Sequence, residues 1–418
     1  MLSTEDLDDI LVGDQEITGP VAVAASTRRA LIPGSPVARA LYLVWSGTPV
    51  TVVDSPPGAG KSTLITEVIA HLMADSDLVI AVATPTRRQS VDLALRIAAE
   101  AGAEFVSLGI KNISEKDCPE GMTESARKLA APGQIRRVTV KTLASMKFGR
   151  VSADLLIIDE SYQATAFDVY AAASDCRQIL MVGDPGQIGP VVTVNTSAWE
   201  SSETAPHRRA AEVFRGREDA QTVHLPNTYR FGPDTVDAIL PLYDFTFGSA
   251  RAAREVVGRN ELASVEVDSD GDPRHLPMLH QVAEQAAGLI GRTVRAADEY
   301  DRTLTATDVA VVLSHNVQAN IVRGMLNNMG IEGMTVDTAD KLQGGQWEAV
   351  VALDPLVGAG AAEGHSASLG RLCVMASRHR SHLTWVHDGT WSDLLESDTE
   401  LDPDERDRAI LTRERLTR

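Results

Sequence analysis

The stretch 54–63, Asp-Ser-Pro-Pro-Gly-Ala-Gly-Lys-Ser-Thr, places the strongest constraint on how this chain can fold. The apolar run 49–53 before it predicts a buried strand, and the apolar spacing of 64–72 after it predicts a helix. A strand, a glycine-rich turn ending in Gly-Lys-Ser and a helix are typical of a phosphate-binding loop, where backbone N–H groups and a helix N-terminus hold an anion. The residues expected to bind the phosphates are Pro57, Gly58, Ala59, Gly60, Lys61, Ser62 and Thr63.

Two side chains of this loop have specific expected roles. Lys61 should reach the β- and γ-phosphates, and the hydroxyl of Ser62 should ligate Mg²⁺. The first position, which is usually glycine, is Ser55. We expect this exchange to weaken the motif, because serine does not enter the φ > 0 region freely.

Two carboxylates follow a second apolar run, 155–158. The run predicts a buried parallel strand, and the carboxyl end of such a strand faces the ligand crevice. We expect Asp159 to hold Mg²⁺, directly or through water, and Glu160 to orient and deprotonate the attacking water.

A third apolar strand, 178–183, leads into a glycine-rich loop that contains Gln187. Its amide could contact the γ-phosphate and report the loss of that group. A plain surface turn is the alternative interpretation.

Polar residues also follow two further predicted strands. Thr84, Pro85 and Thr86 come after 78–83 and open a helix, a setting that suits a nucleic-acid phosphate. An ordinary capped helix start explains them equally well. After the strand 309–313 come Ser314, His315 and Asn316, which could hydrogen-bond a nucleic-acid backbone. The alternative is that His315 caps a helix.

Taken in order, the motifs of the chain resemble those of superfamily 1 helicases. The resemblance covers about 45–388, and the Gly-Asp-Pro-Gly-Gln loop is similar to that of the branch that moves 5′ to 3′. The matching stretches are 56–62, 159–163, 183–190, 224–231, 335–346 and 370–380.

The resemblance implies an α/β fold with two tandem RecA-like domains, each with a parallel sheet, and ATP in the cleft between them. It implies that Arg230 and Arg378 reach the γ-phosphate from the second domain, and that Thr335 and Thr338 contact the nucleic acid. One departure from the family pattern is Gln346 in place of glutamate, which puts a ribose or coupling contact in doubt. The other is Ser377 in place of threonine.

The alternation of strands and helices predicts two domains with additional segments at the ends. We expect an acidic arm over 1–32, a first domain over 33–221 with a small insert over about 102–137, a second domain over 222–390, and a charged tail over 391–418. The tail is expected to form a solvated helix, and a role in docking a partner has no support in the sequence.

The composition limits the class of protein. No apolar run approaches the ~20 residues that a membrane helix needs, and the acidic N-terminus argues against a secretory signal. Three distant cysteines, Cys118, Cys176 and Cys373, fit a reducing cytoplasm. We expect a cytoplasmic monomer of bacterial or phage origin. The net charge of −19 argues against a nucleic-acid binder, so any basic groove must be local.

These patterns and the resemblance predict an ATP-dependent helicase or translocase that uses Mg²⁺ and moves 5′ to 3′ on single-stranded nucleic acid. We expect this nucleic acid to be DNA, although the sequence does not distinguish DNA from RNA. An ATP-gated module that binds or remodels a protein partner through its acidic surface or tails is the alternative. A simple phosphate-loop kinase is a distant third, because it would not need arginines from a second sheet.

Overall fold

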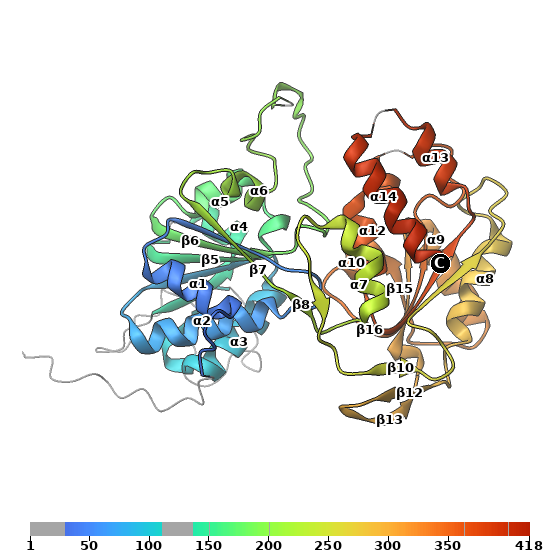
Figure 1. Cartoon of the computed structure of the whole chain (residues 1–418), viewed down its shortest axis with the longest axis horizontal. Coiled ribbons are helices and arrows are strands. Elements are labelled where there is room, and N and C mark those ends of the chain that lie inside the picture. Colours follow the sequence, from blue (N-terminus) through green and yellow to red (C-terminus); the bar gives the residue numbers. More distant parts are fainter. Residues whose placement is uncertain (1–29, 111–136, 150, 200, 363, 400) are drawn as a thin grey trace, which may run out of the picture.

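The computed structural model describes residues 30–418 except 111–136 and the single positions 150, 200, 363 and 400. Most of the acidic arm and most of the predicted insert lie outside the described residues. The described part forms two α/β domains side by side, joined by a short crossing that contains β8 (Figure 1). Within it, none of the helices combines the length and apolar character that crossing a bilayer requires.

The first domain is built on a sheet of seven parallel strands in the order β3-β4-β2-β5-β6-β1-β7. Its strands are β1 (Val50–Asp54), β2 (Ile80–Thr84), β3 (Val106–Leu108), β4 (Val138–Thr142), β5 (Ala153–Asp159), β6 (Cys176–Gly183) and β7 (Ala220–His224). Its helices are α1 (Pro36–Trp45), α2 (Lys61–Asp75), α3 (Arg87–Ala101), α4 (Leu143–Phe148), α5 (Ala166–Ala172) and α6 (Ala210–Arg215).

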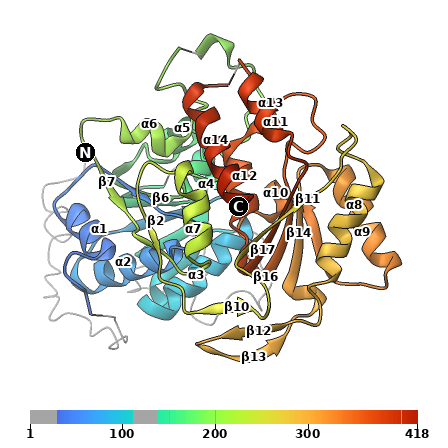
Figure 2. The ribbon, with the colours of Figure 1, turned by 45° about the vertical axis from the view of Figure 1, so that its right-hand side comes forward.

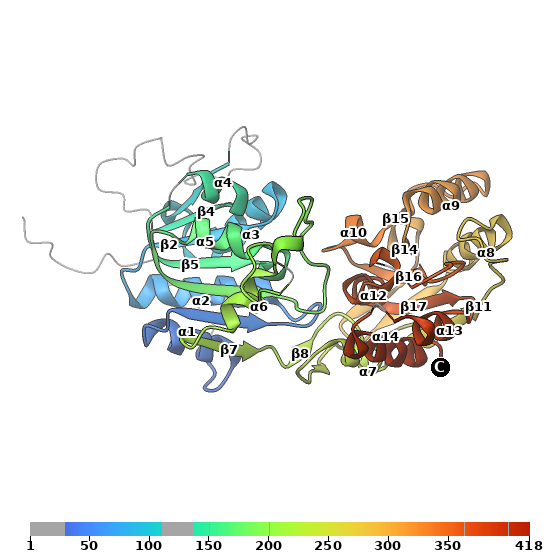
Figure 3. The same cartoon turned by 90° about the horizontal axis from the view of Figure 1, so that it is seen from above.

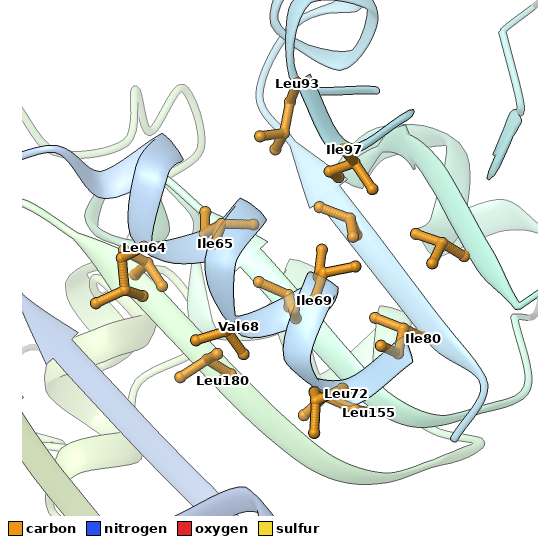
Figure 4. Packing of buried hydrophobic residues seen from close by; sticks show 14 of the residues in the cluster. Leu64, Ile65, Val68, Ile69, Leu72, Ile80, Leu93, Ile97, Leu155 and Leu180 are labelled. Carbon is orange, nitrogen blue, oxygen red and sulfur yellow. The ribbon is translucent and has the colours of Figure 1, made fainter. Parts of the chain in front are cut away.

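Helices cover both faces of this sheet, which explains why β1, β2 and β5 are almost uninterrupted apolar runs. On one face, Leu64, Ile65 and Val68 of α2 pack with Leu93 and Ile97 of α3 over the strands (Figure 4). On the other face, α4, α5 and α6 pack around Leu156 and Phe214. Because both faces are buried, ligands can reach the sheet only at the ends of its strands.

The second domain has a sheet of five parallel strands in the order β11-β17-β16-β14-β15. Its strands are β11 (Leu262–Glu266), β14 (Val309–Leu313), β15 (Thr335–Thr338), β16 (Trp347–Leu353) and β17 (His379–His387). Its helices are α7 (Pro233–Ile239), α8 (Leu276–Ala287), α9 (Asn316–Asn328), α10 (Ala339–Leu342), α11 (Gly364–Ala367), α12 (Leu369–Ala376), α13 (Trp391–Ser397) and α14 (Pro403–Leu416). Figure 3 shows the two sheets side by side.

Two small sheets complete the described fold. The pair β8 (Asn227–Thr228) and β9 (Gly248–Ser249) lies at the crossing between the domains. An antiparallel sheet of β10 (Arg254–Val256), β12 (Thr293–Ala296) and β13 (Glu299–Thr303) extends from the second domain. The two parallel sheets confirm the predicted fold class.

Two expectations about the second half of the chain are wrong. The sequence from Met278 to Arg295 predicts one long helix, but the helix formed there, α8, ends at Ala287, and the last part of the stretch lies in β12. The tail is not a solvated helix. It forms α13 and α14, and α14 packs on the second domain close to α12 (Figure 2), with Arg413 paired to Asp354 and both side chains 1% exposed.

Candidate active site

The phosphate loop joins β1 to α2 in a conformation that depends on two glycines. Gly60, with φ of 87°, immediately precedes Lys61 at the start of α2, so the amides of the first turn point toward the loop. Gly58 has φ of 75°, and a side chain there would also meet Arg230. Thr228 donates to the carbonyl of Pro57 (2.6 Å), and the N–H of Tyr229 donates to the carbonyl of Gly58 (3.0 Å). The crossing between the domains is therefore attached directly to the loop.

Ser55 does not strain this loop, contrary to the expectation from the sequence. Among the described residues, only Glu160 and Asp270 adopt positive φ without being glycine. Ser55 is fully buried, and both its N–H and its hydroxyl donate to the carbonyl of Gly183, at 3.0 and 2.9 Å. The serine thus fastens the start of the loop to the neighbouring strand β6.

The two predicted carboxylates lie at the carboxyl end of β5, facing the loop. Glu160 has left-handed φ and ψ of 54° and 45°, a conformation that costs about 1–3 kcal/mol for a residue other than glycine. Its Oε1 lies 3.2 Å from the ammonium of Lys61. Burial, together with the adjacent charge of Glu160, raises the pKa of Asp159. Burial opposes the charge of Lys61, but the carboxylates of Glu160, Asp184 and Asp159 outweigh it and raise the lysine pKa.

Two arginines of the second domain face the same group of charges. Arg378 is fully buried and donates to the carbonyl of Val374 (3.1 Å) and the hydroxyl of Ser377 (2.9 Å). Arg230 donates to the carbonyl of Ser377 (3.1 Å), while its Nε has no partner in the described structure. Burial and the neighbouring charge of Arg378 lower the pKa of Arg230 to about 9. Burial also lowers the pKa of Arg378. In the described part of the chain, both guanidinium groups donate to backbone carbonyls or a hydroxyl and neither pairs with a carboxylate, so the two arginines are suited to bind an anion.

These groups line one cleft of about 450 Å³ between the domains. Gln187 lies in it and is only 5% exposed, so the loop that contains it is not a plain surface turn. Gln346 also lines the cleft and is exposed. The structure therefore brings together Lys61, Ser62, Thr63, Asp159, Glu160, Gln187, Arg230 and Arg378.

A second cavity, of about 590 Å³, also adjoins the phosphate loop. Its lining includes Leu31, Ile32, Leu225 and Tyr229, together with Gly58 of the loop. A largely apolar space next to a phosphate site suits the base of a nucleotide. The sequence motifs do not predict this cavity. The one signal for it in the sequence is Tyr229, an aromatic residue next to Arg230. Its side chain is 61% exposed and can stack on a base.

The oxygen donors at the cleft fit a Mg²⁺ ion that is held mainly by a nucleotide. Within the described ranges, no three His, Cys, Asp or Glu side chains form a cluster that could bind a metal by themselves. Ser62 and Asp159 both line the cleft, and Mg²⁺ commonly uses one or two protein oxygens plus phosphates and water.

The residues predicted to contact nucleic acid differ in how exposed they are. The hydroxyls of Thr84 and Thr338 belong to residues that are 0% and 6% exposed, and Thr84 bonds internally to Ser90 (2.6 Å). His315 caps α9 with its side chain, as one of the two interpretations predicted. The exposed candidates are Thr86 at the start of α3 and Asn316 at the start of α9, while Pro85 and Thr335 are half-buried and Ser314 is buried.

Comparison with known families gives one match by sequence. Residues 38–232 match the family described as AAA domain, a stretch that runs from α1 to just beyond Arg230. The first domain is therefore similar to AAA domains. The match covers a little under half of the chain and agrees with the superfamily 1 resemblance drawn from the motifs. None of the curated proteins compared with the chain by sequence matches it.

Among solved structures, the chain is similar to helicases of arteriviruses. One is a structure of the PRRSV helicase, with 16% identity and a TM-score of 0.44, covering 84% of this chain and 54% of that one. Another is arterivirus nonstructural protein 10 (helicase), with 14% identity, a TM-score of 0.47, and coverage of 87% and 63%. A structure of that helicase in complex with DNA has 14% identity and a TM-score of 0.47, and the match covers 87% of this chain and 64% of that one. The chain thus spans less than two thirds of these relatives.

Proposed function

We propose that this protein is an ATP hydrolase that moves on single-stranded nucleic acid as a helicase or translocase of the superfamily 1 type. The observation that carries the proposal is the composition of the cleft. Lys61 and Glu160 of the first domain line the same space as Arg230 and Arg378 of the second domain. A cleft that needs both domains to surround a triphosphate links the chemistry to their relative movement.

The ion pair between Lys61 and Glu160 has a consequence for hydrolysis. A γ-phosphate entering the cleft competes with Glu160 for the same ammonium, which lies 3.2 Å from the carboxylate. Once Lys61 turns to the phosphate, Glu160 can accept a proton from the attacking water. Its left-handed backbone holds the carboxylate at the end of β5, where that water must lie.

Ser62 and Asp159 are the residues that would hold Mg²⁺. When bound, the ion would neutralise the charge that develops on the phosphate oxygens. Arg230 and Arg378 would stabilise the remaining charge with planar, permanently cationic groups. When the γ-phosphate leaves, the attraction that holds the two arginines against the first domain is lost, and the domains can separate.

The bound single-stranded nucleic acid would lie across the ends of both sheets. Figure 3 places α3, α9 and α10 on the same side of the molecule, and Thr86, Asn316 and Lys341 on them are exposed. Lys341 donates to Asn316 (2.8 Å) and pairs with Asp337 (2.9 Å). The Gly-Asp-Pro-Gly-Gln loop at 183–187 is the basis for proposing that the protein moves 5′ to 3′ on DNA. We also propose that it acts as a cytoplasmic monomer.

The test is the ATPase rate measured with single-stranded DNA, single-stranded RNA and tailed duplexes of both polarities. We expect strong stimulation by single strands and loss of all turnover in Lys61→Ala. Strand binding should weaken as salt rises, because phosphate contacts release counterions. The ATP-gated partner module would be supported instead if no nucleic acid changed the turnover and a protein co-purified in stoichiometric amount. The net charge of −19 is the observation that favours this alternative.

A further inference from the structure

The loop 184–189, called here the sensor loop, takes its shape from one buried carboxylate. Asp184 is 1% exposed and accepts three hydrogen bonds. Its Oδ2 accepts from the side-chain amide of Gln187 (2.5 Å), and its Oδ1 accepts from the N–H of Gly186 (3.0 Å). The position of the Gln187 amide in the cleft therefore depends on where Asp184 lies.

The third donor to Asp184 comes from the other domain. Tyr243 follows α7 in the second domain, and its hydroxyl donates to Oδ1 of Asp184 at 2.9 Å. The same hydroxyl lies 3.2 Å from the thiol of Cys373 on α12. Because the single phenolic hydrogen is directed to Asp184, the thiol must donate to the phenolic oxygen. This arrangement orients the hydroxyl toward the sensor loop.

The phenol ring is also fitted to the sensor loop by shape. A Cβ at Gly186 would lie 2.5 Å from both Cζ and the hydroxyl oxygen of Tyr243. Phe245 and Phe247 contact the ring edge to face, with centroids 5.5 and 5.1 Å away. Tyr243 therefore has little freedom within the second domain, and any movement of that domain moves its hydroxyl.

Other contacts to the sensor loop come from both sides. From the first domain, Arg209 donates to the carbonyls of Pro185 (2.8 Å) and Gln187 (3.0 Å). From the second domain, Gly370 lies against the backbone of Gln187, where a Cβ would be 2.9 Å from the carbonyl oxygen. Arg209 holds the backbone of the loop whether or not the cleft is closed, whereas Tyr243 can reach Asp184 only when the domains are together.

We propose that Tyr243 is a positioning residue that links closure of the cleft to the orientation of Gln187. This inference rests on the proposed function. In the closed cleft the Tyr243 hydroxyl fixes Asp184, and Asp184 directs the Gln187 amide toward the γ-phosphate. When the second domain moves away, Asp184 loses this donor and Gln187 loses its fixed orientation.

The test compares Tyr243→Phe, which keeps the ring and removes only the hydroxyl, with Tyr300→Phe, the same change in a ring that is 97% exposed. We expect the strand-stimulated kcat of Tyr243→Phe to fall about tenfold, the effect of one buried hydrogen bond, while its KM for ATP stays within about twofold. Tyr300→Phe should match the wild type. Gly186→Ala, which disturbs the same contact from the other side, should reproduce the loss of kcat.

A second measurement does not depend on hydrolysis. Amide hydrogen exchange in 184–189 of the full chain should rise severalfold in Tyr243→Phe and not in Tyr300→Phe. A Tyr243→Phe variant with wild-type kcat, or with raised KM alone, would overturn the inference, as would unchanged exchange. A wild type without ATPase activity would instead contradict the proposed function, and the exchange result would still decide the role of Tyr243.

Discussion

Gly58 of the phosphate loop lies directly against Arg230, so that a Cβ on the glycine would come within 3.0 Å of the arginine Cβ. This contact joins a residue that surrounds the phosphates to one that reaches them from the second domain. It also shows that the two glycines of the loop serve different purposes, because a Cβ at Gly60 would meet only Thr63, at 3.9 Å.

The contact predicts a selective effect for Gly58→Ala. Both the positive φ and the collision with Arg230 oppose the methyl group, so we expect ATP turnover to be lost. Gly47→Ala is the matched control, since Gly47 has φ of 78° and a Cβ there would meet nothing within 4 Å. It should cost about 1 kcal/mol of stability with ATPase activity retained. Thermal unfolding and ATPase rates distinguish the two, and equal activity of both variants would contradict the prediction.

Glu160→Gln should separate binding from hydrolysis. Loss of the general base should lower kcat about 10²–10⁴-fold. ATP should bind at least as tightly as to the wild type, because Lys61 no longer has Glu160 as a competing partner at 3.2 Å. Fluorescent-nucleotide titration measures the affinity, with Lys61→Ala as the variant expected to lose it. Weaker nucleotide binding in Glu160→Gln would show that the ion pair does not compete with the phosphate.

Arg378→Ala should reduce kcat about 10³-fold if the arginine stabilises the transition state. Arg378→Lys should recover little of this activity, because a lysine cannot reproduce the planar fork. Arg177→Ala, which removes a side chain that is 83% exposed and paired with Asp154, is the control and should leave kcat unchanged. Steady-state kinetics with a saturating strand provide the measurement, and a normal kcat for Arg378→Ala would exclude its catalytic role.

The raised pKa of Asp159 predicts an unusual pH dependence of stability. The folded protein keeps a proton on this carboxyl that the unfolded chain has already lost above about pH 4, near the ordinary value. The free energy of unfolding should therefore fall as the pH rises from about 4 toward neutrality. Asp159→Asn should reduce this slope, whereas Glu332→Gln at an exposed position should keep it. Urea unfolding at several pH values without nucleotide checks the sign.

Removing the charge of Arg413, in the C-terminal helix α14, should have a large effect on the stability of the protein. Arg413→Ala should destabilise the protein by about 3–5 kcal/mol, because it leaves the carboxylate of Asp354 buried without its partner. Arg408→Ala on the same helix breaks exposed pairs with Asp244 and Asp404 and should cost at most about 1 kcal/mol. Denaturant unfolding compares them. Similar losses for both would mean that α14 contributes little to the second domain.

Local patterns were sufficient to predict the strands and loops that carry the chemistry. The runs before Asp54, Asp159 and Asp184 form β1, β5 and β6 of one parallel sheet, since only strands buried on both faces are so uniformly apolar. The sequence could not show that Ser55 is harmless, because its partner, Gly183, is distant in the chain. Nor could it show that α14, in the tail predicted over 391–418, packs on the second domain, because the charges of this helix conceal a buried stripe of Ala409, Thr412 and Leu416.

The order of motifs along the chain determined by itself that a phosphate loop, two carboxylates and several arginines are present. It could not determine that Arg230 lies on Gly58, that Tyr243 reaches Asp184, or that an apolar cavity adjoins the phosphate loop. Those relationships join segments of two sheets that are far apart in sequence. They depend on how the domains pack, and packing distances are not encoded in the spacing of residues along one segment.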